Sequence, residues 1–533
     1  MNGAVDRLAE ARGAAARGDW RAVVALTGPV LKESANEPTA LMYEGVARAA
    51  LGEWRAAAAP LNRLARLAPD IGEVHVYRAQ VAQMTGDPAG LIAALRDVAR
   101  CQPDNAAAVQ QLARTALFFG DSEAPSYLAR ALERAPGDAE LVLAREALAA
   151  VAPAAGKPDR VVLVSDMPRV REAKIGAALR AAGWDVHLLC ARAPSYAPDP
   201  YFASCTIFQS PWQAVRLAAA LEPSVCHVFS LMQYETVAAF LAARPAPVIV
   251  DPYDNADMLS DAFVATEPSR HMDRALERSV FARADGLVCR NLETQVAVRR
   301  DGLDLAGPRL FFSDYCWGDI APRPRLSDRD GELHLVYGGT VWLENRSHAG
   351  ADHGLLWLAE LAAANGVHLH AYPTVADAET FETVLADYRA LERTTRFFHL
   401  HRPIADHRAF LEEISQYDVG VLVRRSLVTG GQAWQYAPDK HRFSYANKLA
   451  DYLDAGLAFM IAPQHFLSFG LARRLGIAVP ATPEMFGAGY WGALKDRLLN
   501  HRPDFAAARG RWDLTANAAR LGRFYAQVAG AGK

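Results

Sequence analysis

The sequence has few cysteines and no surplus of charge. Its six cysteines are scattered through 533 residues, with no C-x-x-C pair and no spacing typical of metal ligands. This pattern argues against a disulfide scaffold and predicts reduced thiols in a cytoplasmic protein. The formal net charge is −3 at pH 7. A general nucleic-acid-binding protein usually carries a basic surplus, so the charge argues against that class.

Long apolar runs are also missing. No window approaches the roughly 18 apolar residues of a membrane span, and the first 20 residues lack the apolar core of a signal peptide. We therefore expect no transmembrane segment. The hydrophobic content of 51% and the charged content of 22% are ordinary for a folded protein. The length favours about three to four structural units.

The first 150 residues repeat every 34 positions, as shown by the in-phase glycines Gly18, Gly52, Gly86 and Gly120. Alanine- and leucine-rich stretches with helical spacing lie between these glycines. The pattern resembles tetratricopeptide repeats, with four copies over residues 3–137 and a capping helix at 138–151. It predicts an all-α solenoid over residues 1–151 whose concave surface binds a peptide or protein partner. The alternative is a rigid spacer or a dimerisation surface.

The remainder alternates strands and helices. Proline-rich segments at residues 151–160 and 320–332 predict linkers. The β-α-β order between and after them predicts two Rossmann-like α/β domains with parallel sheets, at residues 160–319 and 331–485. A helical tail at residues 486–533 is expected to pack back on these domains.

The most informative stretch is SYANKLADYLDAGLAFMI, residues 444–461. It predicts a helix that carries Lys448 and Asp451, ends at Gly456 and leads into a buried strand. In α/β domains, ligands bind beyond the carboxyl ends of the strands. There, a cation and a carboxylate one helical turn apart could hold a phosphate and a sugar hydroxyl.

This stretch closely resembles the nucleotide-binding signature of GT-B glycosyltransferases. Three shorter pieces, VLVSDMPRVREAKIGAALRAAGWDVHLL, PVIVDPYDNADML and LVYGGT, look like other segments of that family. The resemblance covers residues 160–533 in the order of elements. It implies that a nucleotide sugar binds mostly to the second α/β domain and the acceptor to the first. Repeats fused to such an enzyme resemble bacterial protein glycosyltransferases, including those that modify flagellin.

The resemblance and the residues themselves together give five candidates for the donor site. Asp451 would bind ribose hydroxyls, Lys448 would neutralise the diphosphate, and Asn447 would cap the helix. Gly339 would let the backbone approach a phosphate, and Arg346 (or His348) would clamp the diphosphate. The alternatives are a solvated helix carboxylate, a surface lysine, a tight turn and a solvated loop arginine.

On the acceptor side, Asp254 is the candidate catalytic base, because it ends a strand where relatives carry a histidine–aspartate step. Tyr253 replaces that histidine, and the alternative role for Asp254 is a loop brace. Lys440 lies in a basic cluster interpreted as a solvated loop. Phe443 stands where two-glutamate members carry their other acid, which leaves retaining or inverting stereochemistry open.

The function predicted is therefore transfer of a sugar from a nucleotide-sugar donor to an acceptor, preferably a protein recruited by the repeats. No D-x-D step in a strong context occurs, so no metal and no other cofactor is expected. Two alternatives remain: an enzyme of cell-surface polysaccharide assembly, and a non-catalytic scaffold with a degenerate GT-B region.

Overall fold

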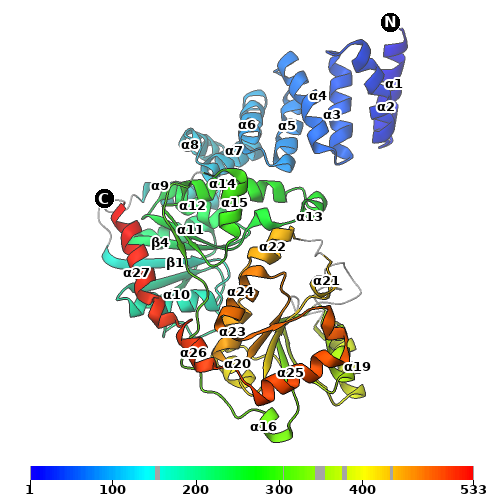
Figure 1. The fold of residues 1–533 in the computed structure, drawn as a ribbon. Helices are drawn as coiled ribbons and strands as arrows, with labels where there is room; N and C mark the ends of the chain where they lie inside the picture. Colours follow the sequence, from blue (N-terminus) through cyan, green and yellow to red (C-terminus); the bar gives the residue numbers. More distant parts are fainter. Residues whose placement is uncertain are drawn as a thin grey trace.

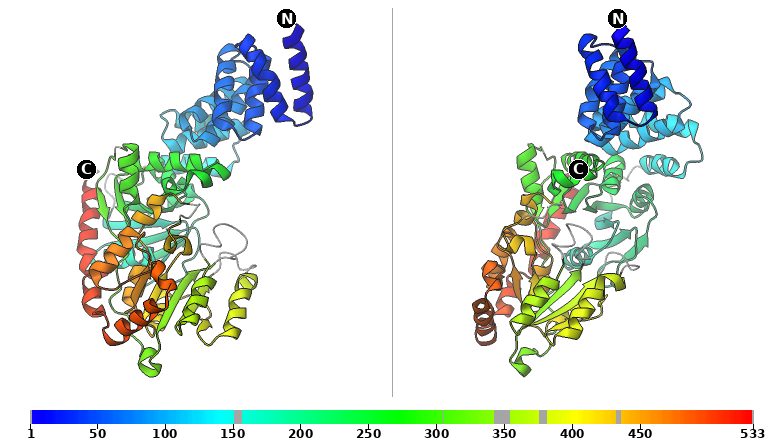
Figure 2. Two further views of the ribbon diagram at one scale, coloured as in Figure 1. Left: turned by 45° about the vertical axis from the view of Figure 1, so that its right-hand side comes forward. Right: turned by 90° about the vertical axis from the view of Figure 1, so that its right-hand side faces the viewer.

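A helical array, two α/β domains and a C-terminal helix follow one another along the chain (Figure 1). The computed structural model describes residues 2–150, 157–303, 305–341, 354–374, 381–431 and 436–531. The array projects from one end of the α/β part, and the two α/β domains lie below it in Figure 1 (further views in Figure 2). The predicted fold class, a helical repeat region followed by two parallel-sheet domains, is confirmed.

Residues 2–150 form four helix pairs and one further helix: α1 (Asn2–Ala16), α2 (Trp20–Glu33), α3 (Pro38–Ala50), α4 (Trp54–Leu67), α5 (Gly72–Thr85), α6 (Pro88–Cys101), α7 (Ala106–Phe119), α8 (Ala124–Arg134) and α9 (Ala139–Ala149). The four in-phase glycines lie inside the pairs with φ between 70° and 77°, a left-handed conformation that favours glycine. The 34-residue period is therefore the period of the helix pairs.

The array is joined to the first α/β domain by packing. Helices α5, α7 and α9 contact α11 (Pro211–Ala220), α12 (Glu235–Ala243) and α14 (Arg270–Arg283). Each of these six helices contributes buried residues to one apolar cluster that continues into the first sheet. Phe118 stacks on Trp212 with ring centroids 6.1 Å apart. Gly86 lies so close to His271 that a Cβ would come within 2.5 Å of its carbonyl oxygen. The array and the first α/β domain thus share a core.

The first α/β domain has a seven-stranded parallel sheet in the order β3-β2-β1-β4-β5-β6-β7. Its strands are β1 (Lys157–Ser165), β2 (Asp185–Cys190), β3 (Ser204–Ile207), β4 (Pro223–Leu231), β5 (Val248–Asp254), β6 (Gly286–Cys289) and β7 (Arg309–Phe311). Besides α11, α12 and α14, its helices are α10 (Val170–Ala181), α13 (Asp261–Thr266), α15 (Glu293–Asp301) and the short η1 (Ala256–Met258). The strand order reverses between β1 and β4, which is where ligands bind in such sheets.

The second α/β domain has a six-stranded parallel sheet in the order β10-β9-β8-β11-β12-β13. Its strands are β8 (His334–Thr340), β9 (His368–Thr374), β10 (Phe398–Leu400), β11 (Val419–Leu422), β12 (Ala458–Ile461) and β13 (Ala478–Pro480). Its described helices are α16 (Ser327–Asp330), α18 (Leu356–Ala364), α19 (Phe381–Thr394), α20 (His407–Ile414), α21 (Arg425–Val428), α22 (Pro438–Phe443), α23 (Lys448–Asp454) and α24 (Phe466–Leu475). The strand order reverses between β8 and β11.

The chain closes with η3 (Pro483–Phe486), α25 (Ala488–Asn500), α26 (Phe505–Gly510) and α27 (Leu514–Ala531). Helix α27 runs back along the first α/β domain and packs on α10 and β4 (Figure 1). Its Tyr525 is hydrogen-bonded to His227 of β4, and both side chains are buried. His227 is thus a core histidine with a partner.

Two further expectations concern the described residues. None of the described helices has both the length and the apolar character that crossing a membrane requires. No disulfide joins the six cysteines, and four of them are buried: Cys190, Cys226, Cys289 and Cys316.

We predict that the first α/β domain needs the repeats that cover it. Deletion of residues 1–150 would expose the apolar faces of α11 and α12, including Trp212 and Val237, so the fragment should aggregate. Deletion of residues 1–67 removes only α1 to α4, for which no extensive contact with the described α/β domains exists, and should leave a soluble, folded chain. Size-exclusion chromatography and thermal unfolding distinguish the two fragments. A monodisperse, cooperatively unfolding 151–533 fragment would contradict this prediction.

Candidate active site

The two sheets face one another with the carboxyl ends of their strands, and a cavity of about 140 Å³ lies between them. The first domain contributes α10 and the ends of β5 and β7. The second contributes the first turns of α20 and α23. The lining residues are Arg169, Val170, Arg171, Lys174, Tyr253, Asp314, His407, Asn447 and Asp451. Three basic side chains of one domain therefore face a carboxylate of the other.

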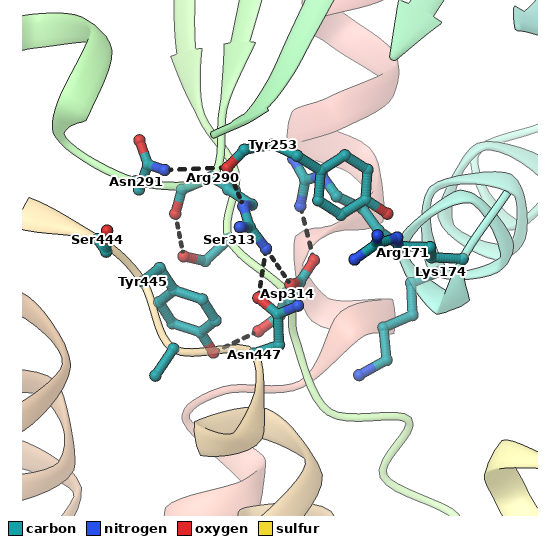
Figure 3. Close-up of polar contacts among 12 residues, drawn as sticks. Arg171, Lys174, Tyr253, Arg290, Asn291, Ser313, Asp314, Ser444, Tyr445 and Asn447 are labelled. Atoms are coloured by element: carbon teal, nitrogen blue, oxygen red, sulfur yellow. Dashed lines mark hydrogen bonds and ion pairs between the residues drawn. The ribbon is translucent and has the colours of Figure 1, made fainter. Parts of the chain in front are cut away.

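Helix α23 begins at Lys448 and carries Asp451, as predicted. Asn447 occupies its N-cap position, but the prediction that its side chain caps the helix is wrong, because no such hydrogen bond forms. Its Oδ1 instead accepts a hydrogen bond from Arg290 of the other domain (Figure 3). Gly456 follows the helix with φ 73° and β12 begins at Ala458, as predicted. Buried apolar residues fix the other side of α23, so Asp451 faces the cavity.

Asp451 is held by basic groups from both domains. Its Oδ1 lies 3.1 Å from Nε2 of His407 and 3.8 Å from Nζ of Lys174, whose side chain is only 3% exposed. Burial opposes ionisation, yet His407 and Lys174 lower the pKa of Asp451 to about 2. The carboxylate is therefore charged at neutral pH. It lines the cavity and 21% of its side chain is exposed, so it can still accept hydrogen bonds from a ligand.

Lys448 points away from this cavity, toward the end of β8. Its ammonium group donates a hydrogen bond to the Gly338 carbonyl and lies 5.0 Å from the centre of the Tyr337 ring. Burial lowers the pKa of Lys448 to about 8, although nearby Asp451 opposes the shift. No carboxylate pairs with Lys448 in the described part of the chain. Its charge is therefore poorly compensated, as expected for a group that receives an anion.

Gly339 is required by the packing of Lys448. Its φ is 153°, and a Cβ there would lie 2.6 Å from Nζ of Lys448 and 3.2 Å from the Tyr337 hydroxyl. The glycine therefore admits the lysine to the end of β8, next to the segment where a phosphate was expected. Arg346 and His348 lie outside the described residues.

Asp254 is ion-paired. Its Oδ1 contacts Nζ of Lys440 and lies 3.4 Å from Nη2 of Arg290. Burial opposes ionisation, but these two cations hold the pKa of Asp254 well below its usual range. Such a carboxylate is a weak proton acceptor, so the geometry favours the brace over the catalytic base. The interpretation of Lys440 as solvated is wrong, because its buried ammonium group also lies 2.9 Å from Glu293.

Two arginines at the cavity, Arg171 in its lining and Arg290 beside it, connect the strand ends of the first domain. Arg171 lies 2.7 Å from both Asp251 and Asp314, and all three side chains are buried. Arg290 stacks on Tyr253, and the Tyr445 hydroxyl donates to the Asp314 carbonyl (Figure 3). Asp251 is therefore the partner of Arg171 in a buried, structural ion pair.

A second cavity of about 200 Å³ opens where the strand order of the first sheet reverses. Ser165, Arg169 and Tyr253 line it, and the last two also line the interdomain cavity. Behind it, Glu172 accepts hydrogen bonds of 2.7 Å from the hydroxyls of Ser165 and Tyr253. Burial raises the pKa of Glu172 to about 7, which suits a group that exchanges protons at neutral pH.

Sequence reasoning missed Lys174, His407, Arg290 and Glu172. Each is an ordinary charged residue of a helix or strand end, and its importance arises from contacts with segments far away in the chain. The only sequence signal was position, because α10, α20 and Arg290 each follow the carboxyl end of a strand.

We predict that Asp254→Asn destabilises the protein by roughly 3 kcal/mol, at the lower end of the cost of breaking a buried ion pair, because Asp254 is partly exposed. The Asp254 pKa is depressed from 3.8, so its contribution is present above about pH 4 and is lost as the pH falls through the folded-state pKa. Thermal unfolding at pH 7 and at acidic pH measures this. Asp261→Asn is the matched control, since its side chain is 97% exposed beside Arg274. Equal stability of the two variants would contradict a structural role for the Asp254 ion pair.

No protein-family model matches the sequence, and no curated protein sequence is significantly similar to it. Among solved structures, the sucrose-phosphate synthase of Thermosynechococcus elongatus matches 70% of this chain and 100% of its own, with 15% identity and a TM-score of 0.50. A mutant O-GlcNAc transferase of Thermobaculum terrenum matches 100% of this chain and 99% of its own, with 17% identity and a TM-score of 0.41. Anabaena HepE in complex with UDP-glucose matches 70% and 99%, with 12% identity and a TM-score of 0.46. The likeness to the synthase shows a shared fold, and the predicted GT-B arrangement is confirmed.

Proposed function

We propose that this protein is a glycosyltransferase that transfers a sugar from a nucleotide-sugar donor to a protein acceptor recruited by the repeat array. One observation carries the proposal. Asp451 faces a cavity between two GT-B domains, where His407 of its own domain and Lys174 of the other hold it ionised.

At the donor site, Asp451 accepts hydrogen bonds from ribose hydroxyls, with His407 fixing its orientation. Lys448, Lys174 and Arg346 are the cations assigned to the departing diphosphate. Gly339 leaves room for Lys448. Asn447 lines the cavity and is held in place by the hydrogen bond that it accepts from Arg290. Fixed cations of this kind stabilise developing negative charge on the leaving group without a metal ion.

At the acceptor site, the second cavity holds the group that receives the sugar. Arg169 and Tyr253 line both cavities, so the sugar and the acceptor meet beside them. The acceptor proton passes to the Tyr253 or Ser165 hydroxyl as that hydroxyl gives its own proton to Glu172. Asp254 then acts as a positioning residue through Arg290, which stacks on Tyr253. Asp254→Asn should accordingly keep turnover within about 10-fold, whereas loss of a general base costs about 10²- to 10⁴-fold.

The repeats offer the partner a restricted surface. Because α1 contacts α3 and α3 contacts α5, the first helices of the pairs line the inner side of the array. The α/β domain covers α7, α9 and part of α5, which leaves α1 and α3 open. On α1 the side chain of Val5 is exposed, with 66% of its surface accessible. A protein such as flagellin, suggested by the family resemblance, is the acceptor assigned to this surface.

We predict that a nucleotide sugar stabilises the wild-type protein and that Asp451→Ala weakens its binding by about 10- to 100-fold, the equivalent of roughly 1.5–3 kcal/mol for hydrogen bonds to a charged group. Thermal shift against a panel of nucleotide sugars identifies the donor, and calorimetric titration gives the affinities. Asp496→Ala is the control, because Asp496 is an exposed acid of α25, a helix that packs into the core of the second α/β domain. Equal affinity in both variants, or no binding in the wild type, would contradict the proposal. Donor hydrolysis by the wild type would exclude a non-catalytic scaffold.

We further predict that donor binding is linked to the protonation of Lys448. The pKa of its ammonium group is lowered to about 8 by burial, and a bound diphosphate should raise it. Binding then takes up a proton above pH 8, and affinity falls as the pH rises past that value. Titration calorimetry of the nucleoside diphosphate in buffers of different ionisation enthalpy measures the uptake. Lys448→Arg keeps a positive charge that does not titrate, so it should remove the pH dependence. Unchanged proton uptake in that variant would rule out Lys448 as its source.

A further inference from the structure

Five histidines lie on one face of three neighbouring strands in the second α/β domain. His334 belongs to β8, His368 and His370 to β9, and His399 and His401 lie in and just after β10. The register places His334 beside His368 and His370 beside His399. Since residues two apart on a strand point to the same side of a sheet, the two H-x-H pairs bring four imidazoles together with His334.

Three of these side chains are positioned to share a ligand. His334, His368 and His370 are between 3% and 7% exposed, and each has a ring nitrogen within 4.8 Å of those of the other two. Nδ1 of His334 lies 3.0 Å from Nε2 of His370. Two nitrogens on a tetrahedral zinc ion are about 3.3 Å apart, given Zn–N bonds of about 2.0–2.1 Å. This pair thus already has nearly the separation of two ligands.

The other nitrogen of each imidazole has a partner of the kind that supports metal ligands. Nε2 of His334 lies 3.1 Å from an Asp330 carboxylate oxygen, and Nε2 of His368 lies 2.5 Å from Glu332. Nδ1 of His370 lies 3.0 Å from His401. Metal-binding histidines usually donate their second N–H to such a carboxylate or other acceptor, which fixes the tautomer and the ring orientation.

We propose that His334, His368 and His370 bind a divalent transition-metal ion of the zinc type. Imidazole ligands suit zinc, copper and nickel, whereas magnesium and calcium prefer oxygen ligands. The ion replaces the proton between His334 and His370, and that proton moves to the other nitrogen of its ring, which then donates it to Asp330 or His401. The His334 and His368 rings are stacked with centroids 4.5 Å apart, so His368 must turn out of the stack to complete the site. His399, 2.8 Å from His368, is the nearest candidate for a fourth ligand.

The site is separate from the cavity assigned to glycosyl transfer. His334 and His368 are the first residues of their strands, whereas the interdomain cavity lies beyond the carboxyl ends of the sheet. The ion would link β8 and β9 directly, and β10 as well if His399 binds. Its role is therefore structural, and the proposal does not rest on the proposed function.

The test uses the full-length chain without a polyhistidine tag, dialysed against Zn²⁺ and assayed by mass spectrometry of the metal. We expect one ion per chain in the wild type and a rise in melting temperature that a chelator reverses. His370→Gln should lose the ion and the response to Zn²⁺. The matched control His187→Gln alters a buried histidine of β2, paired with Ser204, in the other domain and should retain both.

Equal zinc content in His370→Gln and His187→Gln, or less than stoichiometric zinc in the wild type, would overturn the proposal and leave the histidines as a hydrogen-bonded ladder. If His370→Gln fails to fold, Co²⁺ bound to the wild type decides the question. Its absorption spectrum should be that of a tetrahedral, nitrogen-ligated ion, and a spectrum identical to that of aqueous Co²⁺ would refute the site.

Discussion

The buried ammonium group of Lys440 lies between Asp254 and Glu293, two carboxylates of the other α/β domain. A buried charge without partners is costly, so the two domains are held at a separation at which all three groups stay paired. Ser444 donates to Glu293 beside them, and the Leu292 amide donates to the Phe443 carbonyl. These contacts hold residues 440–447 packed against the ends of β5 and β6. This contact fixes the separation of the two domains. It therefore sets the width of the interdomain cavity and the 3.8 Å distance between Nζ of Lys174 and Oδ1 of Asp451.

This contact also decides which edge of the first sheet can receive a second substrate. The ends of β5, β6 and β7 are covered, because Arg290 and Asp314 are bonded to Asn447 and Tyr445 of the second domain. The ends of β1, β2 and β4 stay open and form the second cavity. Asp254 lies on the covered side. Asp254 therefore does lie at the end of a strand, as the sequence predicted, but the second domain occupies the space where an acceptor would bind.

Local and periodic features of the fold were predictable from sequence. The 34-residue glycine period, the strand-helix alternation and the end of α23 at Gly456 each depend on residues close in the chain. Of the candidate site, the positions of Asp451 and Lys448 at the start of α23 were predictable from their motif. The partners Lys174, His407 and Arg290 were not, because they come from distant segments. Asn447 shows the same limit, since an arginine 157 positions away takes the oxygen expected to cap the helix. The five histidines of the second domain did have a local signal, the H-x-H pattern of two strands. A search for metal ligands based on the spacing of cysteines could not detect it.

The shared core between the repeats and the first α/β domain changes how partner binding can act. A flexible tether would raise only the effective concentration of an acceptor near the cavity. Here α5, α7 and α9 are packed on α11, α12 and α14, and Gly86 and Gly120 are in close contact with α14. The open helices α1 and α3 therefore keep a fixed distance and direction from the cavity. Under the proposed function, only those segments of a bound protein that lie at this distance and direction can reach the cavity. The array therefore selects the protein by contact and also selects, by position, which of its residues is modified.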